Sequence, residues 1–445
     1  MNARFSLGID LGTSNSAVAA DNFESDEVTV VEITQILRPN QIGESSTLPS
    51  ALYLPHPDEF PADAIQLPWA NNSRAAIIGH FAREHGALMP DRLVTSAKSW
   101  LSNFHVDPRR PVLPWRSEIK EPKLSAFDCS RLYLEHLKEG FLYAEQLQGR
   151  TWDLSEGQIV LTVPASFDEV ARNLTAEAAE AAGLGKVTLL EEPQAAFYAW
   201  TARAAGSWRS QVNSGDIILV CDVGGGTADF SLIAISGKEG NLELERISVG
   251  EHILLGGDNM DLALAYTLQA QLESAGKTLD AWQFLALTHA VSRAKVDLFN
   301  DESVAQAPIS VPSRGSSLFA KTVSATLDRQ TLEQVVLDGF FPITKVTDLP
   351  AERRSSGLQE FGLPYASDPI VSKHRARFLT RSLLNVKASD SLKALVGTSA
   401  EASGYLRPTA VLFKGGVFNA APIRKRVLDL LGSWNRGQAV RELEG

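Results

Sequence analysis

GIDLGTSN at residues 8–15 and CDVGGGTAD at residues 221–229 are two versions of one pattern. In each, an apolar run reaches an aspartate, Asp10 or Asp222, and a glycine turn with small hydroxyl residues leads into a second apolar run. That arrangement is typical of a β-hairpin. One Asp-x-Gly turn would mean little, because short motifs of this kind are common. Two copies, each opening one half of the chain, predict two related lobes.

The two turns have the chemistry of a phosphate site. Glycine leaves backbone N–H groups uncovered, and consecutive N–H groups form a nest for anions. Thr13, Ser14 and Thr227 add hydroxyl groups. Carboxylates at strand ends suit the water shell of Mg²⁺, which prefers oxygen ligands and keeps several waters. The repeat therefore predicts two hairpins that clamp a triphosphate and its metal ion between them.

The composition is that of an ordinary globular protein, with 445 residues, 44% of them hydrophobic and 21% charged. The net charge of −11 disfavours nucleic acid as the main partner but leaves room for a nucleotide. Cys129 and Cys221 have no spacing typical of zinc or of a disulfide framework. Because no signal peptide or membrane-length apolar run is present, we expect a soluble cytoplasmic protein without a membrane partner.

Strand and helix patterns mix along the whole chain, which indicates an α/β fold. The predicted strands cover residues 4–10, 16–20, 158–163, 187–190, 217–222, 230–235 and 411–414. The predicted helices cover residues 127–150, 168–182 with Gly183 as its cap, 193–200, much of 261–300, and 422–431. Polar, proline-containing stretches at residues 105–122 and 347–372 are typical of loops, and residues 38–72 are expected to be loops around short strands such as 51–54.

Several segments resemble the heat-shock protein 70 (DnaK-type) family, in that family's order. Residues 8–16 and 222–229 resemble its two phosphate hairpins, and residues 254–258 and 411–422 resemble its two glycine motifs near the nucleoside. Residues 161–167, followed by Arg172, resemble a strand, proline and helix of the family, and residues 190–196 resemble its first connecting helix. The resemblance covers nearly the whole chain. It implies the actin-like (ribonuclease H-like) ATPase fold, with two duplicated lobes and a nucleotide in the central cleft.

By this resemblance, lobe I covers residues 1–210 with a small subdomain at about 39–115. Lobe II covers residues 211–445 with a small subdomain at about 256–328. Residues 341–400 have no counterpart in the family and are expected to be a loop-rich insertion. The family's final ATPase helix and its peptide-binding domain are expected to be absent, as in a fragment of a longer chaperone.

The resemblance also assigns roles to residues, and a plain structural role competes with each. Asp10, Asp222 and Asp229 would hold Mg²⁺, with Asp229 near it or near a monovalent ion such as K⁺. The competing interpretation is that they are plain turn or strand-end aspartates. The implied catalytic residues are Asp10, Arg83, Glu192, Asp222 and Thr227. The implied nucleotide-binding residues are Gly12, Thr13, Ser14, Asn15, Gly224, Gly225, Gly226, Thr227, Gly256, Gly257, Lys295, Gly415 and Gly416.

Two of the implied catalytic residues, Glu192 and Arg83, also have a specific structural interpretation. Glu192 would orient the attacking water, but a carboxylate before Pro193 also suits the N-terminus of a helix. Arg83 stands where the family has a lysine that reaches the γ-phosphate. Arginine keeps the charge in a different shape, which puts the rate of hydrolysis in question, and a plain surface arginine is the competing interpretation.

The adenosine side departs further from the family. Lys295 and the glycine pair Gly415-Gly416 match, whereas Ser292, Phe299, Val417 and Asn419 replace the family's residues. Adenine selectivity is therefore the weaker expectation. Pro164 and Arg172 match positions that pass the nucleotide state to the peptide-binding half, although proline also ends strands and arginine suits a charged helix.

The function implied is slow hydrolysis of ATP that controls client binding through lobe closure in a chaperone. Its partners would be a J-domain co-chaperone, a nucleotide exchange factor and, through the absent domain, client peptides. A sugar or acetate kinase shares both hairpins, although Glu192-Pro193 and the pair Pro164 and Arg172 favour the chaperone. The sequence also leaves open a filament protein of the actin type and a nucleotide-binding regulator without hydrolysis.

Overall fold

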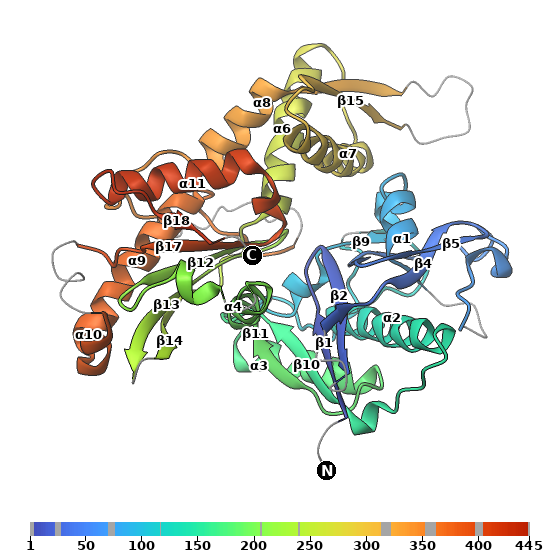
Figure 1. Ribbon diagram of the computed structural model, residues 1–445. Coiled ribbons are helices and arrows are strands. Elements are labelled where there is room, and N and C mark those ends of the chain that lie inside the picture. Colours follow the sequence, from blue (N-terminus) through green and yellow to red (C-terminus); the bar gives the residue numbers. More distant parts are fainter. Residues whose placement is uncertain are drawn as a thin grey trace. The chain divides into compact units, whose positions relative to one another are not determined.

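Figure 1 shows a computed structural model of the chain, which describes residues 4–22, 28–69, 76–115, 117–204, 207–238, 241–312, 322–351, 362–396 and 404–443. By their contacts these residues fall into two compact units. The first is Met1–Val163, Phe167–Glu192 and Glu360–Pro364, and the second is Pro164–Ser166, Pro193–Gln359 and Tyr365–Gly445. The lobe and subdomain limits expected above stay predictions.

The main sheet of the first unit has the order β11-β10-β1-β2-β3, with β6 also paired to β2. Its strands are β1 (Phe5–Asp10), β2 (Asn15–Asn22), β3 (Val28–Val30), β6 (Leu48–Pro49), β10 (Gln158–Val163) and β11 (Thr188–Glu191). β1, β10 and β11 are parallel, whereas β2 runs antiparallel to β1. Phe5, Leu7 and Ile9 alternate into the core along β1. The predicted hairpin at the start of the chain is confirmed.

Two helices, α2 (Ala126–Leu147) and α3 (Glu169–Ala181), pack against each other in the first unit. The α3 N-terminus is fixed by Asp168, whose carboxylate accepts a hydrogen bond from the Ala171 N–H at 2.8 Å. Just after the C-terminus of α3 comes Gly183, whose φ of +79° is a left-handed conformation that favours glycine. Both helices and the glycine cap were predicted and are confirmed.

A smaller group of elements precedes α2 in the sequence. It comprises β4 (Ile33–Arg38), β5 (Gln41–Ser45), β7 (Leu52–Tyr53), β8 (Ile77–Ile78), β9 (Leu93–Val94), α1 (His80–Gly86) and the short 3₁₀ helix Ala97–Trp100. β4 pairs with β5, and β7 pairs with both β8 and β9.

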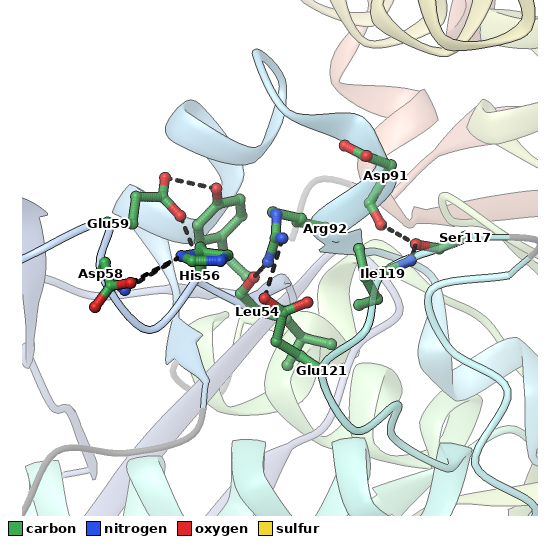
Figure 2. A network of polar contacts seen from close by, with 10 residues as sticks. Leu54, His56, Asp58, Glu59, Asp91, Arg92, Ser117, Ile119 and Glu121 are labelled. Atoms are coloured by element: carbon green, nitrogen blue, oxygen red, sulfur yellow. Dashed lines mark hydrogen bonds and ion pairs between the residues drawn. The ribbon is translucent and has the colours of Figure 1, made fainter.

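Polar contacts hold this group together, as Figure 2 shows. Arg92 donates to the Leu54 carbonyl at 2.9 Å and to Glu121 Oε1 at 3.1 Å. Glu59 accepts from the Tyr53 hydroxyl at 2.7 Å and lies 2.7 Å from His85 Nε2. Burial acts to raise the pKa of Glu59, but these hydrogen bonds hold it below its ordinary value. Because His85 is on α1, the network fixes the helix that carries Arg83.

The second unit is built on a sheet of order β14-β13-β12-β17-β18. Its strands are β12 (Ile217–Val223), β13 (Ala228–Lys238), β14 (Asn241–Val249), β17 (Ala410–Lys414) and β18 (Arg441–Glu442), with a separate hairpin of β15 (Gln306–Val311) and β16 (Val323–Asp328). β12 is a central strand with apolar clusters on both faces, and it is accordingly an almost continuous apolar run. The second predicted hairpin, β12 with β13, is confirmed.

The second unit also contains several helices, some of them beside this sheet and others beside the β15–β16 hairpin. They are α4 (Glu192–Arg203, with Glu192 counted in the first unit), α5 (Trp208–Gln211), α6 (Gly257–Ser274), α7 (Ala281–Asn300), α8 (Arg329–Glu333), α9 (Val371–Ala388), α10 (Asp390–Val396) and α11 (Ala421–Trp434). The helices predicted after Pro193, within 261–300 and over 422–431 are confirmed. Among the residues that the structure describes, no helix has the length and apolar character needed to cross a membrane.

The expectation that residues 341–400 are mainly loops is wrong for α9 and α10. Leu379, Leu383 and Val386 of α9 are buried in the same core as β12 and β13. Their spacing places them on one face of a helix, between basic residues that obscured the pattern in the sequence. Within this region, residues 352–361 and 397–400 lie outside the described residues.

Candidate functional site

The first half-site lies at the carboxyl ends of parallel strands. Asp10 ends β1, and the parallel strands β10 and β11 of the same sheet end at Val163 and Glu191. Such edges are where open α/β sheets bind ligands. Asp10 Oδ1 accepts a hydrogen bond from the Thr162 hydroxyl at 2.7 Å, and the side chain is exposed. The contact fixes the carboxylate while leaving it open to solvent.

The glycine turn after Asp10 is held through its carbonyl groups. Ser50 donates its hydroxyl to the Gly12 carbonyl at 2.7 Å and its N–H to the Ser14 carbonyl at 2.9 Å. Among the described residues, the N–H groups of Thr13 and Ser14 donate to no acceptor. A Cβ at Gly12 would lie 2.1 Å from the carbonyl oxygen of Asn15, so only glycine fits there. The predicted phosphate-binding residues Gly12 to Asn15 thus form a turn with unused donors.

Glu192 pairs with a buried lysine that the sequence reasoning missed. Lys98 Nζ lies 2.5 Å from Glu192 Oε1, and the Lys98 side chain is only 7% exposed. Lys98 Nζ also lies 5.8 Å from the centre of the Phe167 ring. A buried cation beside a carboxylate neutralises it and fixes its direction. The available signal was a lysine inside the apolar segment Ala97–Leu101.

Arg83 is largely exposed on α1, with its Nε 3.8 Å from Glu84 Oε1. No contact among the described residues joins its guanidinium to Asp10 or Glu192. α1 does contact β6, the strand paired with the start of β2, so Arg83 is on an element next to the first turn. Of the two cations, Lys98 is therefore the one in contact with a predicted catalytic carboxylate.

The second half-site also lies at the carboxyl ends of parallel strands. Asp222 is near the end of β12, and its register partner on β17 is Lys414, which Gly415 follows. Gly415 has φ +84°, and a Cβ there would lie 2.2 Å from the Val223 carbonyl oxygen and 2.7 Å from Asp222 Oδ1. The predicted glycine pair Gly415-Gly416 is therefore placed directly beside Asp222.

The turn after Asp222 is fixed by the start of α6. The N–H groups of Gly257 and Asp258 donate to the carbonyls of Gly224 and Gly225 at 3.0 and 2.8 Å. A Cβ at Gly256 would lie 2.5 Å from the Gly225 carbonyl oxygen, which requires glycine. In the part of the chain that the structure describes, the N–H groups of Gly225, Gly226 and Thr227 have no acceptor. The second turn thus resembles the first: the carbonyls of Gly224 and Gly225 are engaged, and among its N–H groups that of Gly224 donates to the Thr227 carbonyl while the next three have no acceptor among the described residues.

Lys295 joins this cluster on the predicted nucleoside side. Its Nζ lies 3.2 Å from the Gly257 carbonyl oxygen and 2.6 Å from Asp261 Oδ1. A Cβ at Gly257 would also lie 3.6 Å from Val417, which follows Gly416. The structure therefore brings Gly257, Lys295 and the turn after β17 together, although the Lys295 charge is already paired with Asp261.

Asp229 lies opposite Asp222 in the antiparallel register of β12 and β13. Unlike Asp10, it is buried, and it accepts a hydrogen bond from Ser166 and contacts His252. Burial acts to raise the pKa of Asp229, but His252, Ser166 and Thr227 hold it below its ordinary value. The sequence reasoning did not anticipate Ser166 or His252, because nothing local marks them.

Pro164 and Arg172 are counted in different units. Pro164 belongs to the short segment Pro164–Ser166 that is counted with the second unit. The Arg172 guanidinium lies 3.8 Å from Glu191 Oε1 in the first unit. Their expected part in passing on the nucleotide state remains a prediction.

Two of the three predicted metal ligands, Asp10 and Asp222, have surroundings that suit a hydrated magnesium ion. Mg²⁺ usually keeps several waters and takes one or two carboxylates together with phosphate oxygens. Asp10 is exposed and Asp222 is partly exposed, each beside a turn with unused N–H donors. Among the described residues, no group of three or more His, Cys, Asp or Glu side chains could enclose an ion alone.

Comparison with known proteins places this arrangement in one family. The family model described as Hsp70 protein matches residues 6–348. A chaperone protein HscA homolog of Vibrio cholerae serotype O1 (strain M66-2) is 31% identical over 305 residues, 66% of this chain and 42% of that protein. Chaperone protein HscA of Klebsiella pneumoniae (strain 342) is 30% identical over 339 residues, 73% of this chain and 48% of that protein. The chain spans less than half the length of these curated relatives.

The match to the family model includes both Asp-Gly hairpins, the Lys98–Glu192 pair and the Gly256-Gly257 turn. The mixed α/β structure agrees with the fold that the resemblance implied. This chain belongs to the Hsp70 family.

Proposed function

We propose that this chain binds ATP with Mg²⁺ and hydrolyses it slowly, as the nucleotide-binding part of a chaperone. The observation that carries the proposal is the repeated half-site. Asp10 and Asp222 each stand at the carboxyl end of a parallel strand, before a turn in which two or three successive N–H groups have no acceptor among the described residues. Backbone donors of this kind suit phosphate oxygens. The finer proposal is that both half-sites hold one nucleotide in a two-lobed actin-like fold.

In the proposed reaction a water attacks the γ-phosphate, and the protein mainly positions the reactants and offsets charge. Mg²⁺, when bound, would neutralise charge on the phosphates, with Asp10 and Asp222 holding its waters. The turns at Thr13-Ser14 and Gly225–Thr227 would donate N–H groups to phosphate oxygens.

Glu192 would orient the water, and the 2.5 Å contact from Lys98 supports this role by fixing the carboxylate. Arg83 keeps the positive charge of the family's lysine, so this replacement by itself does not argue against hydrolysis. Arg83 would then help to retain the triphosphate from an exposed position on α1.

The chaperone role comes from the family, and its details are further proposals. The relatives named above are described as chaperones. We propose that the nucleotide state sets lobe closure, and that closure controls client binding elsewhere in a longer protein. A J-domain co-chaperone, a nucleotide exchange factor and a cytoplasmic location follow only by resemblance.

Calorimetric titration of the purified chain with ATP, with and without Mg²⁺, tests the proposal. We expect binding that strengthens with Mg²⁺ and that weakens at least tenfold in Asp222→Asn. Glu243→Gln, which removes an exposed carboxylate of β14 outside the half-sites, is the matched control and should bind as the wild type does. Equal binding by wild type and Asp222→Asn would refute the proposed site.

A nucleotide-binding regulator without hydrolysis is the second candidate. It is favoured by the exposed Arg83 and by the pairing of Lys295 with Asp261. Such a protein would bind Mg-ATP equally well but release no phosphate. Phosphate release therefore separates the two candidates, and titration alone does not.

A further inference from the structure

Asp229 is buried and is contacted by several side chains of the protein itself that can donate hydrogen bonds. The residue is 6% exposed, and its Oδ1 accepts a hydrogen bond from the Ser166 hydroxyl. His252 Nδ1 lies 3.5 Å from Asp229 Oδ1 and 2.7 Å from Ser166 Oγ. The Thr227 hydroxyl also bonds to Asp229. Side chains from three separate segments therefore converge on one carboxylate.

The register of the hairpin explains why this carboxylate needs so many partners. Asp222 and Asp229 lie directly opposite each other on β12 and β13, where like charges destabilise the pair. A buried carboxylate must also replace the hydrogen bonds that water would give it. Ser166, His252 and Thr227 meet both needs, and they hold the pKa of Asp229 below its ordinary value against the effect of burial.

These surroundings do not fit the metal role that the resemblance implied for Asp229. A hydrated Mg²⁺ or a monovalent ion needs carboxylate oxygens with open lone pairs and room for its waters. Around Asp229, the approaching groups are hydroxyl and imidazole donors on a buried side chain. Asp10 and Asp222 have the exposure that Asp229 lacks.

The hydrogen bond to Asp229 determines whether the Thr227 hydroxyl acts as a donor or as an acceptor toward a ligand. A hydroxyl group has one hydrogen and two lone pairs. Because a carboxylate only accepts, the Thr227 hydrogen is directed at Asp229, and its oxygen remains as an acceptor. An acceptor suits a water that attacks phosphorus, since such a water donates its hydrogens to the protein. A phosphate oxygen, by contrast, requires a donor.

We infer that Asp229, Ser166 and His252 form a positioning network that fixes the Thr227 hydroxyl as an acceptor for the attacking water, and that Asp229 is not a metal ligand. The inference rests on the proposed hydrolysis. In that reaction a bond forms between the water oxygen and the γ-phosphorus, and the bond to the ADP oxygen breaks. One proton of the water stays on the phosphate product, and the other goes to solvent. The network itself changes no covalent bond.

The test combines steady-state ATP hydrolysis with Mn²⁺ binding, measured by electron paramagnetic resonance in the presence of ADP. We expect Asp229→Asn to lower kcat at least tenfold, with KM for ATP and Mn²⁺ affinity within about twofold of the wild type. Asp222→Asn should weaken Mn²⁺ at least tenfold. Turnover of the wild type in KCl and in choline chloride of equal ionic strength should agree within about twofold.

Two substitutions at His252 separate positioning from folding. His252→Leu removes the nitrogen beside Asp229 and should lower kcat as Asp229→Asn does. His252→Asn puts an amide nitrogen near the position of Nδ1 and should restore kcat to within about threefold of the wild type. Asp216→Asn is the structural control, because Asp216 is buried just before β12 and bonds to Arg441 and Thr409. It should lower the unfolding temperature without changing kcat per folded molecule.

Three results would overturn the inference. They are a tenfold loss of Mn²⁺ affinity in Asp229→Asn, a tenfold dependence on K⁺ that Asp229→Asn removes, and an unchanged kcat in His252→Leu. If the wild type hydrolyses no ATP, the proposed function fails together with the role of the network. If it hydrolyses ATP and His252→Leu does so equally well, only the network fails.

Discussion

The two Asp-Gly hairpins are alike in sequence and different in their electrostatics. In the first, Asp10 lies opposite Ala17, is exposed, and accepts one hydrogen bond, from Thr162. In the second, Asp222 lies opposite Asp229, whose carboxylate is buried among Ser166, His252 and Thr227. A second carboxylate inside a hairpin needs a supporting network, and that network comes from segments distant in the sequence.

The backbones of the two turns are also held in different ways. Ser50 binds the carbonyls of the first turn, whereas the N-terminus of α6 binds those of the second. In both cases several N–H groups of the turn, at Thr13 and Ser14 and at residues 225–227, have no acceptor among the described residues. The common result is a pair of turns with successive N–H groups that suit the proposed binding of phosphate, held in two different ways.

The largest effects are expected from removing each hairpin's aspartate in turn. Asp10→Asn and Asp222→Asn should each lower turnover of ATP by about 10²-fold or more, because each removes a charge from the proposed metal site. Their effects on the nucleotide-free protein should differ. Asp222→Asn removes one of two facing carboxylates and should raise the free energy of unfolding by about 0.5–1 kcal/mol. Asp10→Asn should change it by less than about 0.5 kcal/mol.

Phosphate release and urea unfolding check both parts of this prediction. A loss of stability in Asp222→Asn larger than that in Asp10→Asn would contradict the account of the facing carboxylates. An unchanged turnover in either variant would remove that hairpin from the proposed site.

An intermediate effect is expected from the two cations of the first unit. Lys98→Met leaves Glu192 without its buried partner and should lower kcat roughly tenfold to a hundredfold. It should also lower the free energy of unfolding by about 1–3 kcal/mol. Arg83→Met removes an exposed charge and should lower kcat less than tenfold, with a change in stability below about 0.5 kcal/mol.

The measurement is kcat and thermal unfolding for both variants, with Glu192→Gln to complete a double-mutant cycle with Lys98→Met. Non-additive losses in the cycle would support the pair as a unit. A larger loss of kcat in Arg83→Met than in Lys98→Met would show that Arg83 carries the role of the family's lysine.

A last comparison concerns how the glycines of the two turns affect stability. A Cβ at Gly12 would lie 2.1 Å from a backbone oxygen, whereas at Gly224 it would meet no atom within 4 Å. Gly12→Ala should therefore lower the free energy of unfolding by about 1–3 kcal/mol, and Gly224→Ala should change it by less than about 0.5 kcal/mol. Chemical denaturation of the nucleotide-free protein measures both, and equal losses would contradict the difference between the turns.

Features with local signals could be predicted from the sequence. The hairpins, the helix cap at Gly183 and the glycine turns depend on residues next to one another. The resemblance to the family added the order of the motifs and most of the candidate site. α9 was missed because basic residues stand between its buried apolar positions.

The partners of the site residues could not be predicted in the same way. Lys98 meets Glu192 across a long stretch of chain, and Ser166 and His252 reach Asp229 from separate segments. No spacing rule connects such residues, because their proximity depends on how the strands are ordered in the sheets. The sequence therefore suggested a metal role for Asp229, whereas its surroundings favour a positioning role.

The most direct test of the central claim is single-turnover hydrolysis of γ-labelled ATP by the purified protein, with Mg²⁺ and with a chelator. Excess protein would be mixed with ATP, and the reaction stopped with acid at successive times. The account predicts release of about one phosphate for each bound ATP in Mg²⁺, and retention of intact ATP in the chelator. Recovery of intact bound ATP in the presence of Mg²⁺ would contradict it.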